Sequence, residues 1–268
     1  MRRAGFLQRP DCRIYYEVEG SGPAIVFAHG LGGNHLSWWQ QVAHFAPRYT
    51  CVAFAHRGFM PSDAFDGARA PEHFADDLAA LVDHLALEDV RLVAQSMGGW
   101  TCLAYALSEP RRVRALVMAS TSGAVDFSGL DAAAGDEVRE WMRRAPGALT
   151  DLEARGLHAA AGERMHREQP AAAHLYGQIS RLTPQPFRDA AREKIRAMRV
   201  QPPKLLGELA MPVLFLTGGE DWVFPPAAGP ALAAYARAGR AERIAQAGHS
   251  VYFERPDHFN RIVGEFIA

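Results

Sequence analysis

The stretch that decides the fold is residues 92–99, Leu-Val-Ala-Gln-Ser-Met-Gly-Gly. An apolar strand runs into Ser96, then into two glycines and the helix-compatible segment 100–108. This layout predicts a sharp turn between strand and helix that holds the serine in a strained conformation, with its hydroxyl above the sheet. The competing interpretation is a serine that only caps the following helix. We therefore expect a nucleophile at Ser96.

A glycine-rich loop, His-Gly-Leu-Gly-Gly at residues 29–33, follows the apolar run 24–28. In acyl transfer, fixed backbone N–H groups stabilise the negative charge that develops on the carbonyl oxygen. The loop and the serine turn together predict an oxyanion hole made by the N–H groups of Leu31 and Met97. A plain turn or a dinucleotide-binding turn is the alternative. The dinucleotide motif, however, requires a third glycine where His35 stands.

An acid is expected next in chain order. The apolar run 213–217 leads into Gly-Gly-Glu-Asp, residues 218–221, which places a carboxylate at the carboxyl end of a strand, where open α/β sheets build their sites. We select Asp221 as the acid. Its neighbour Glu220 and the more distant Asp126 are the competing carboxylates, and an Asp in such a loop is often only a turn former.

The base is expected last, and His249 stands in the loop Gln-Ala-Gly-His-Ser, residues 246–250. It follows a short apolar stretch, 243–245, and precedes the helical pattern 257–266. His258 lies within that helical pattern and is a poorer candidate. A neutral imidazole at His249 would take the Ser96 proton, while the acid fixes its tautomer.

The order of elements along the chain predicts a mostly parallel α/β sheet. Short β-like runs recur at 13–18, 24–28, 50–55, 90–94, 115–119 and 213–217. Segments with helical spacing, such as 71–86, lie between them, as in βαβ units. From about 122 to 203 the β-like runs vanish, and helical pieces are broken at Pro146, Gly147, Gly156, Pro170, Pro184 and Pro186. We expect an α/β core at 1–121 and 204–268 with a helical insertion at 122–203.

Composition favours a small-molecule partner for this chain. The 268 residues are 49% hydrophobic, and a formal net charge of -1 argues against a nucleic-acid binder. No signal peptide and no membrane-spanning segment are expected. Three cysteines without CxxC spacing favour a reduced compartment, so we expect the cytoplasm. Neither HExxH nor cysteine-rich spacing occurs, so no metal or cofactor is expected. The oligomeric state stays open.

These segments resemble the α/β-hydrolase superfamily along almost the whole chain, and its esterase and enol-lactonase-like members are the most similar. The resemblance extends to residues 56–63, His-Arg-Gly-Phe-Met-Pro-Ser-Asp, where the family often has Asp-x-Arg-Gly-x-Gly-x-Ser. Ala55 and Met60 depart from that pattern. Ala94 departs from the usual glycine two residues before the nucleophile. The resemblance implies a helical cap over the active site, matching 122–203.

What the resemblance implies is hydrolysis of a small, moderately apolar carboxyl ester or lactone through an acyl-serine intermediate. A C–C bond hydrolase that acts on a diketone-type substrate is one alternative, and a ligand sensor without turnover is another. Substrate contacts are expected at His29, Gly30, Trp38, Gln95, Trp141 and Trp222. Trp38 has packing in the core as its competing interpretation, and the apolar cap residues are divided in the same way between pocket and packing.

Overall fold

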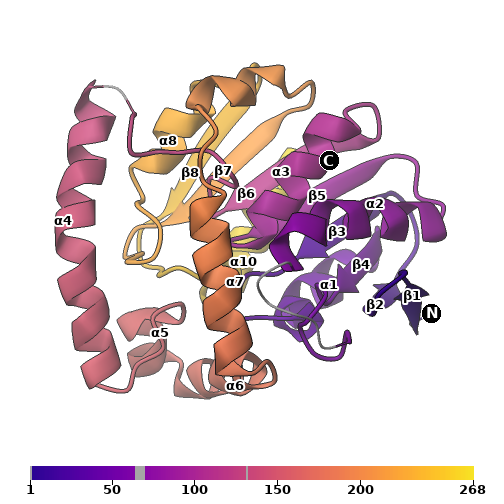
Figure 1. Ribbon diagram of the computed structural model, residues 1–268, viewed down its shortest axis with the longest axis horizontal. Coiled ribbons are helices and arrows are strands. Elements are labelled where there is room, and N and C mark those ends of the chain that lie inside the picture. Colours follow the sequence, from indigo (N-terminus) through magenta and orange to yellow (C-terminus); the bar gives the residue numbers. More distant parts are fainter. Residues whose placement is uncertain (1, 64–69, 131) are drawn as a thin grey trace.

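Continuous apolar runs form the middle of the sheet. The computed structural model describes residues 2–63, 70–130 and 132–268. All residues of β3 (Ala24–Ala28) and β5 (Val90–Gln95) are buried. Successive side chains of β3 point to opposite faces, so that Val26 packs in one hydrophobic cluster and Phe27 in another. Strands buried on both faces need helices on both sides, and Figure 1 shows the sheet between two helical layers.

The sheet has eight strands in the order β1-β2-β4-β3-β5-β6-β7-β8. The remaining strands are β1 (Arg3–Gln8), β2 (Arg13–Glu19), β4 (Thr50–Phe54), β6 (Val113–Ala119), β7 (Val213–Gly218) and β8 (Gly239–Ile244). The pairs β1–β2 and β2–β4 are antiparallel, and all other neighbours are parallel. The predicted mostly parallel sheet is confirmed, and the carboxyl ends of its parallel strands meet at one edge.

The two edge strands differ from the sequence-based expectation. Strand β1 was not predicted, and β8 begins at Gly239 rather than at the apolar stretch 243–245. Only Leu7 of β1 and Ile244 of β8 are fully buried. An edge strand with one exposed face carries little of the apolar pattern from which strands are recognised.

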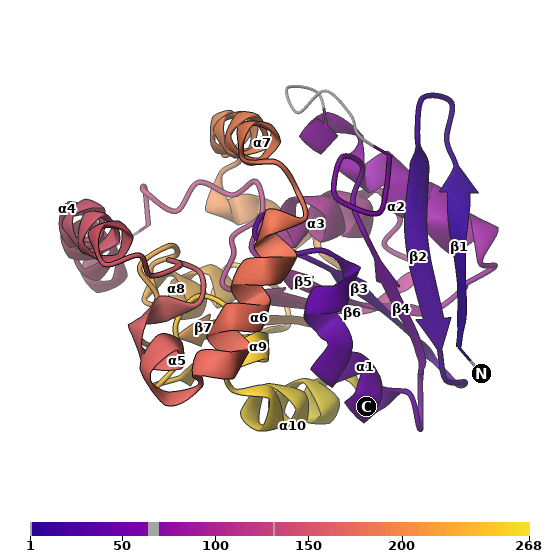
Figure 2. The same ribbon diagram turned by 90° about the horizontal axis from the view of Figure 1, so that it is seen from below.

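Helices cover both faces of the sheet. Side chains of α2 (Phe74–His84), α3 (Gly98–Ser108) and α8 (Ala228–Ala233) share one hydrophobic cluster with the sheet. Those of α1 (Trp39–Phe45) and α10 (Pro256–Ile267) share the other. Figure 2 shows α2 and α3 on the opposite side of the sheet from α1 and α10. Short helical turns complete the core at His35–Trp38, Ala70–His73, Pro203–Glu208 and α9 (Val251–Glu254).

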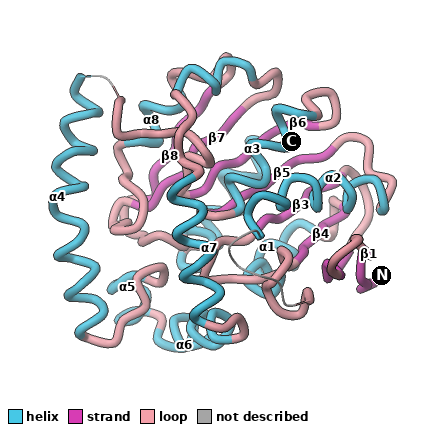
Figure 3. Tube along the Cα trace, in the orientation of Figure 1, coloured by secondary structure: helices cyan, strands magenta, loops and turns pink. Residues whose placement is uncertain are grey.

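Four helices lie between β6 and β7, and we call them the cap helices. They are α4 (Ala132–Ala154), α5 (Gly162–Glu168), α6 (Pro170–Arg181) and α7 (Gln185–Ala197). Figure 3 shows helices and loops without strands in this described part of the chain. The limits 122–203 of a separate cap unit stay a prediction.

Two expected breaks in the cap are wrong, because α4 continues through Pro146 and Gly147. A proline inside a helix removes one hydrogen bond without necessarily ending the helix. The carbonyl oxygen of Pro146 remains engaged, since it accepts a hydrogen bond from the Thr150 hydroxyl at 3.0 Å. The other expected breakers fit helix ends: Pro170 begins α6, and Pro184 and Pro186 flank the start of α7.

A buried hydrogen-bonded chain supports the loop that follows β3. The backbone N–H of His56 donates to His29 Nε2 at 3.0 Å, so the proton of His29 sits on Nδ1 and is donated to the Gly30 carbonyl oxygen at 2.8 Å. His56 Nε2 lies 2.9 Å from the Thr101 hydroxyl. Burial lowers the pKa of His29 to about 3, and it lowers the pKa of His56 well below its ordinary value. Both rings are therefore neutral in the folded protein.

This pair predicts a stability that falls in mild acid. Below pH about 6.5 the unfolded chain binds protons at histidines that the folded chain keeps neutral, so unfolding is favoured as the pH falls. One such group removes about 2 kcal/mol between pH 7 and pH 5. His56→Gln should reduce the loss of unfolding free energy over this interval by about that amount, measured by urea denaturation.

The matched control is His258→Gln, because His258 is exposed on α10. It should leave the slope of stability against pH unchanged. Equal slopes for His56→Gln and the unmodified protein would contradict a neutral buried His56.

Candidate active site

The turn after β5 has the strained geometry of a nucleophile elbow. Ser96 has a φ of 48°, in the left-handed region, and its backbone N–H donates to the carbonyl oxygen of Ala119 on the neighbouring strand at 3.0 Å. A Cβ atom at Gly98 would lie 2.2 Å from the carbonyl oxygen of Ala28, so glycine is needed where α3 passes β3. Ala94, which replaces the usual glycine, is paired in register with the equally small Ala28.

Asp221 and His249 meet at the ends of neighbouring strands. The acid lies in the loop after β7 and the histidine in the loop after β8. His249 Nδ1 is 2.9 Å from Asp221 Oδ2, and the other carboxylate oxygen accepts hydrogen bonds from the backbone N–H groups of Val223 and Phe224 at 2.7 and 2.9 Å. Both side chains are buried. Because the carboxylate holds Nδ1, the other ring nitrogen is left for proton transfer at Ser96.

The competing carboxylates point elsewhere. Glu220 accepts hydrogen bonds from Arg164 of α5, with Nε 2.9 Å from Oε2. Asp126 Oδ1 accepts the backbone N–H of Ser128 at 2.9 Å and so caps its own turn. Of the three candidate acids, Asp221 is the one that contacts His249.

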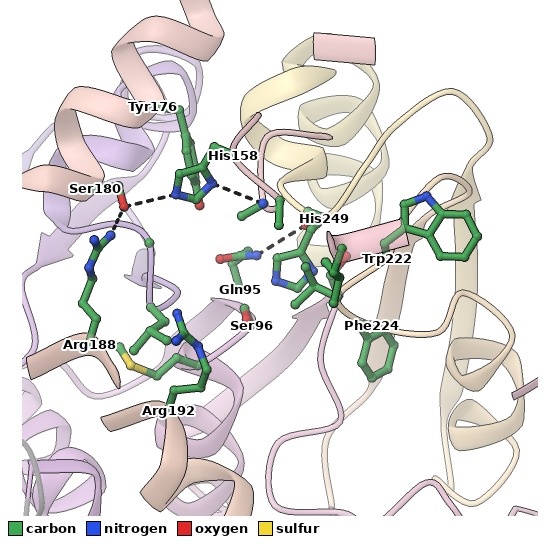
Figure 4. Close-up of a pocket in the computed structure, with 18 of the residues that line it drawn as sticks. Gln95, Ser96, His158, Tyr176, Ser180, Arg188, Arg192, Trp222, Phe224 and His249 are labelled. Atoms are coloured by element: carbon green, nitrogen blue, oxygen red, sulfur yellow. Dashed lines mark hydrogen bonds between the residues drawn. The ribbon is translucent and has the colours of Figure 1, made fainter. Parts of the chain in front are cut away.

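Several contacts fix the loop that carries the base. Gln95 Nε2 donates to the carbonyl oxygen of His249 at 3.3 Å, as drawn in Figure 4. The N–H of Gly248 donates to Glu254 Oε2 at 2.7 Å. The N–H of Ser250 donates to the carbonyl oxygen of Ala160, in the cap, at 3.0 Å. The position of the imidazole thus depends on β5 and on the cap helices.

The predicted oxyanion donors lie at the same cavity as Ser96. Leu31 and Met97 both line that cavity. Within the described ranges, the backbone N–H of neither residue donates to a protein acceptor. The loop of Leu31 is closed by a hydrogen bond from the Gly33 N–H to the Gly30 carbonyl oxygen at 3.0 Å. Two unengaged N–H groups flanking a serine are what a developing oxyanion requires.

The expected substrate contacts divide into two groups. Gln95, Trp141 and Trp222 line the cavity. Trp38 does not: it is fully buried in the core, with its ring 4.2 Å from that of Tyr252. Its assignment to the pocket is therefore wrong, since an aromatic residue next to a loop can equally turn inward.

His29 and Gly30 likewise do not line the cavity, and their assignment as substrate contacts is wrong. His29 is fully buried beneath the loop, where it supports Gly30. A Cβ atom at Gly30 would lie 2.0 Å from Gln95 Oε1, so this glycine makes room for the side chain that holds the His249 loop. Both residues therefore shape the site from below.

The cavity between the sheet edge and the cap helices has a volume of about 1190 Å³. Ser96 and His249 lie at its floor, and Figure 4 shows Trp222 and Phe224 on one side of them and Arg188 and Arg192 on the other. Sequence reasoning missed the arginines of this wall. The signal was their helical spacing: Arg188, Arg192 and Arg196 recur on one face of α7.

The cap also contacts the acid loop directly. The indole N–H of Trp141, on α4, donates to the backbone carbonyl oxygen of Asp221 at 2.8 Å. A second link is the pairing of Arg164 with Glu220. The cap helices therefore contact the loop that carries Asp221 in addition to covering the cavity.

In the part of the chain that the structure describes, no three His, Cys, Asp or Glu side chains gather closely enough to hold a metal ion. No helix in the same described part has both the length and the apolar character needed to cross a membrane.

Comparison with known proteins gives the family. The chain is 26% identical to a 2-hydroxy-6-oxononadienedioate/2-hydroxy-6-oxononatrienedioate hydrolase of Paraburkholderia xenovorans, with 96% of this chain and 91% of the relative covered. It is similar in structure to an esterase from Rhodococcus sp. ECU1013, with a TM-score of 0.78, 25% identity and 99% and 98% of the two chains covered. It is also similar to Est816, an N-acyl homoserine lactone degrading enzyme, with a TM-score of 0.76, 25% identity and 98% and 100% covered. A family model described as the alpha/beta hydrolase fold matches residues 23–256, which confirms the resemblance inferred from the motifs: the chain belongs to the α/β-hydrolase fold family.

Proposed function

We propose that this protein hydrolyses a carboxyl ester or lactone of small to moderate size through an acyl-Ser96 intermediate. The observation that carries the proposal is the buried hydrogen bond between Asp221 Oδ2 and His249 Nδ1 at 2.9 Å, at the cavity where Ser96 stands in its strained turn. A nucleophile, a base and an oriented acid in these roles are the requirements for acyl transfer.

The proposed reaction follows from the geometry. His249 takes the proton of the Ser96 hydroxyl, and Oγ attacks the carbonyl carbon of the substrate. The negative charge on the carbonyl oxygen is stabilised by the N–H groups of Leu31 and Met97. When the intermediate collapses, the alkoxide leaves and receives the proton from His249. A water molecule then attacks the acyl-serine by the same route, with His249 again as base, and the acid is released.

Two solved structures support the choice of ester or lactone. One is an esterase and the other an enzyme that degrades N-acyl homoserine lactones, and each covers nearly the whole chain. Their identity of 25% to this chain is low enough that the substrate itself has to be argued from the cavity.

The second candidate is hydrolysis of a C–C bond beside a ketone. The relative from Paraburkholderia xenovorans, a hydrolase of an oxo-dienedioate, favours it. The two reactions separate in a direct comparison: an esterase turns over aryl esters rapidly, with a burst of phenol, whereas a C–C hydrolase cleaves a diketone faster than an ester. The relatives reported above are all enzymes, so they give a sensor role no support.

Replacement of the nucleophile is the first test. Ser96→Ala should abolish hydrolysis of short-chain 4-nitrophenyl esters and labelling by a fluorophosphonate probe, because no other group replaces the attacking oxygen. Labelling is located by peptide mass spectrometry, and circular dichroism checks that the variant is folded. A variant that keeps near-normal turnover would show that the nucleophile is elsewhere.

The two adjacent carboxylates give a matched pair of variants. Asp221→Asn keeps an oxygen to accept the N–H groups of Val223 and Phe224 but favours the wrong tautomer of His249, so kcat should fall by about 10³- to 10⁴-fold. Glu220→Gln loses only its pairing with Arg164 and should change kcat by no more than a few-fold. Steady-state ester kinetics measure both. A larger fall in kcat for Glu220→Gln than for Asp221→Asn would show that Glu220, and not Asp221, is the acid.

A further inference from the structure

One wall of the cavity is lined with positive charge. Arg188, Arg192 and Arg196 lie one turn apart on α7, and Arg199 follows just beyond its end. All four line the cavity, together with Arg181 from the end of α6, whereas Glu153 is the one acidic residue among the described lining side chains. A helix that only covered a small neutral ester would be expected to present an apolar face here.

Arg188 forms no ion pair among the described residues, and the nearby Asp189 pairs with Arg192 instead. Its guanidinium donates to the Ser180 hydroxyl and to the Gln185 side-chain oxygen, both of which are uncharged. Its Nε is buried and has no partner among the residues that the structure describes. Burial, and then the nearby Arg192, lower the pKa of Arg188. An arginine nevertheless keeps its proton, so a charged side chain without an ion-pair partner among the described residues lines this wall of the cavity.

The neighbouring arginines contribute to the positive charge of this wall to different degrees. Arg199 Nε is likewise buried without a partner in the described chain, and its guanidinium lies 5.1 Å from the ring centre of Trp100. Burial and Arg196 lower its pKa to about 10. Arg192 pairs with Asp189 at 2.5 Å, and both side chains are about half exposed. An exposed pair of this kind is weak, so Arg192 can also serve an anion.

The opposite wall is mainly apolar, although Glu153 of α4 also lines the cavity. Trp141, Ala145 and Leu149 from α4 line it, and Trp222 and Phe224 continue it beside the acid loop. His158, which also lines the cavity, adds no charge, because burial lowers its pKa to about 4. The cavity is therefore cationic on the α7 side of Ser96 and mainly apolar on the α4 side. Figure 4 shows Arg188 and Arg192 on one side of Ser96, with Trp222 and Phe224 on the other.

We propose that the substrate is an ester or lactone that also carries a carboxylate, which Arg188 binds with help from Arg192 while the apolar part of the molecule lies against α4. The planar guanidinium matches a carboxylate with two parallel hydrogen bonds, and Arg188 and Arg192 both line the cavity that holds Ser96. This inference rests on the proposed function for the reaction at Ser96.

The test compares two esters of equal shape and different charge. Mono-4-nitrophenyl glutarate carries a carboxylate at the far end of its acyl chain, and 4-nitrophenyl 4-carbamoylbutanoate carries a neutral amide there. The unmodified protein should favour the anionic ester in kcat/KM by about 10- to 100-fold. Equal kcat/KM values for the two esters would overturn the inference while leaving the esterase proposal intact.

Variants then assign the preference to the cationic wall. Arg188→Gln should reduce it to about a few-fold or less, mainly through KM, and Arg188→Lys, which keeps a charge, should retain part of it. The matched control is Arg167→Gln, because Arg167 is an exposed arginine of α5 that pairs with Glu168 and does not line the cavity. A preference that survives Arg188→Gln would exclude Arg188 as its source.

Binding without turnover separates this inference from the proposed function. Ser96→Ala should bind the anionic ester more tightly than the amide in titration calorimetry, and Ser96→Ala combined with Arg188→Gln should bind the two alike. Ser96→Ala could bind the anionic ester selectively while the unmodified protein hydrolyses neither ester. That result would support an anionic ligand and refute the proposed ester hydrolysis. Equal binding of the two by Ser96→Ala would refute the ligand class.

Discussion

The hydrogen bond between Asp221 and His249 is the interaction on which the rest of the site depends. It joins two loops that follow neighbouring parallel strands, β7 and β8, and therefore exists only when those strands are in register. The carboxylate is fully engaged, because its second oxygen accepts two backbone N–H groups of its own loop. A buried carboxylate held in this way has one free direction, toward the imidazole, and a buried charge is tolerated only when it is so paired. The sheet thus positions the two loops that carry Asp221 and His249, and the N–H groups of the Asp221 loop stabilise the charge of its carboxylate.

Ser96, the proposed nucleophile, imposes a second constraint of a different kind. Its left-handed φ of 48° is strained for a serine, and such strain persists only where the surroundings over-determine it. The hydrogen bond from the Ser96 N–H to Ala119 fixes the turn on one side, and the close passage of Gly98 over Ala28 fixes it on the other. Because β3, β5 and β6 are consecutive neighbours in the sheet, the loop after β3 and the turn after β5 both open into the cavity that Leu31, Ser96 and Met97 line.

The sequence predicted those features that are encoded locally. These features include an apolar strand followed by a serine and two glycines, and an acid and a histidine that each come just after a strand. Such patterns can be recognised from hydrophobic periodicity and from the residues that end a strand. The structure brings Asp221 and His249 together, as their order in the chain predicts. The direction in which a side chain points could not be predicted from the sequence. Trp38 faces the core rather than the cavity, and the spacing of Arg188, Arg192 and Arg196 defines a helix face without saying what that face contacts. Strand β1 carries too few buried residues to be recognised.

The cap helices connect selectivity to catalysis. A cavity of about 1190 Å³ is larger than a small ester fills, so shape alone would allow such a molecule several orientations over Ser96. The positive charge of the α7 wall and the apolar surface of the α4 wall would restrict these orientations. Only one orientation of the proposed substrate places its anionic group against α7 and its apolar chain against α4. Since Trp141 of α4 also holds the carbonyl group of Asp221, the helix that receives the apolar part is bonded to the loop that orients the base. In the proposed binding mode, the substrate's place between the two cap helices also sets its orientation toward the proposed triad. Substrates that do not fit between these helices would be oriented poorly for the proposed attack by Ser96.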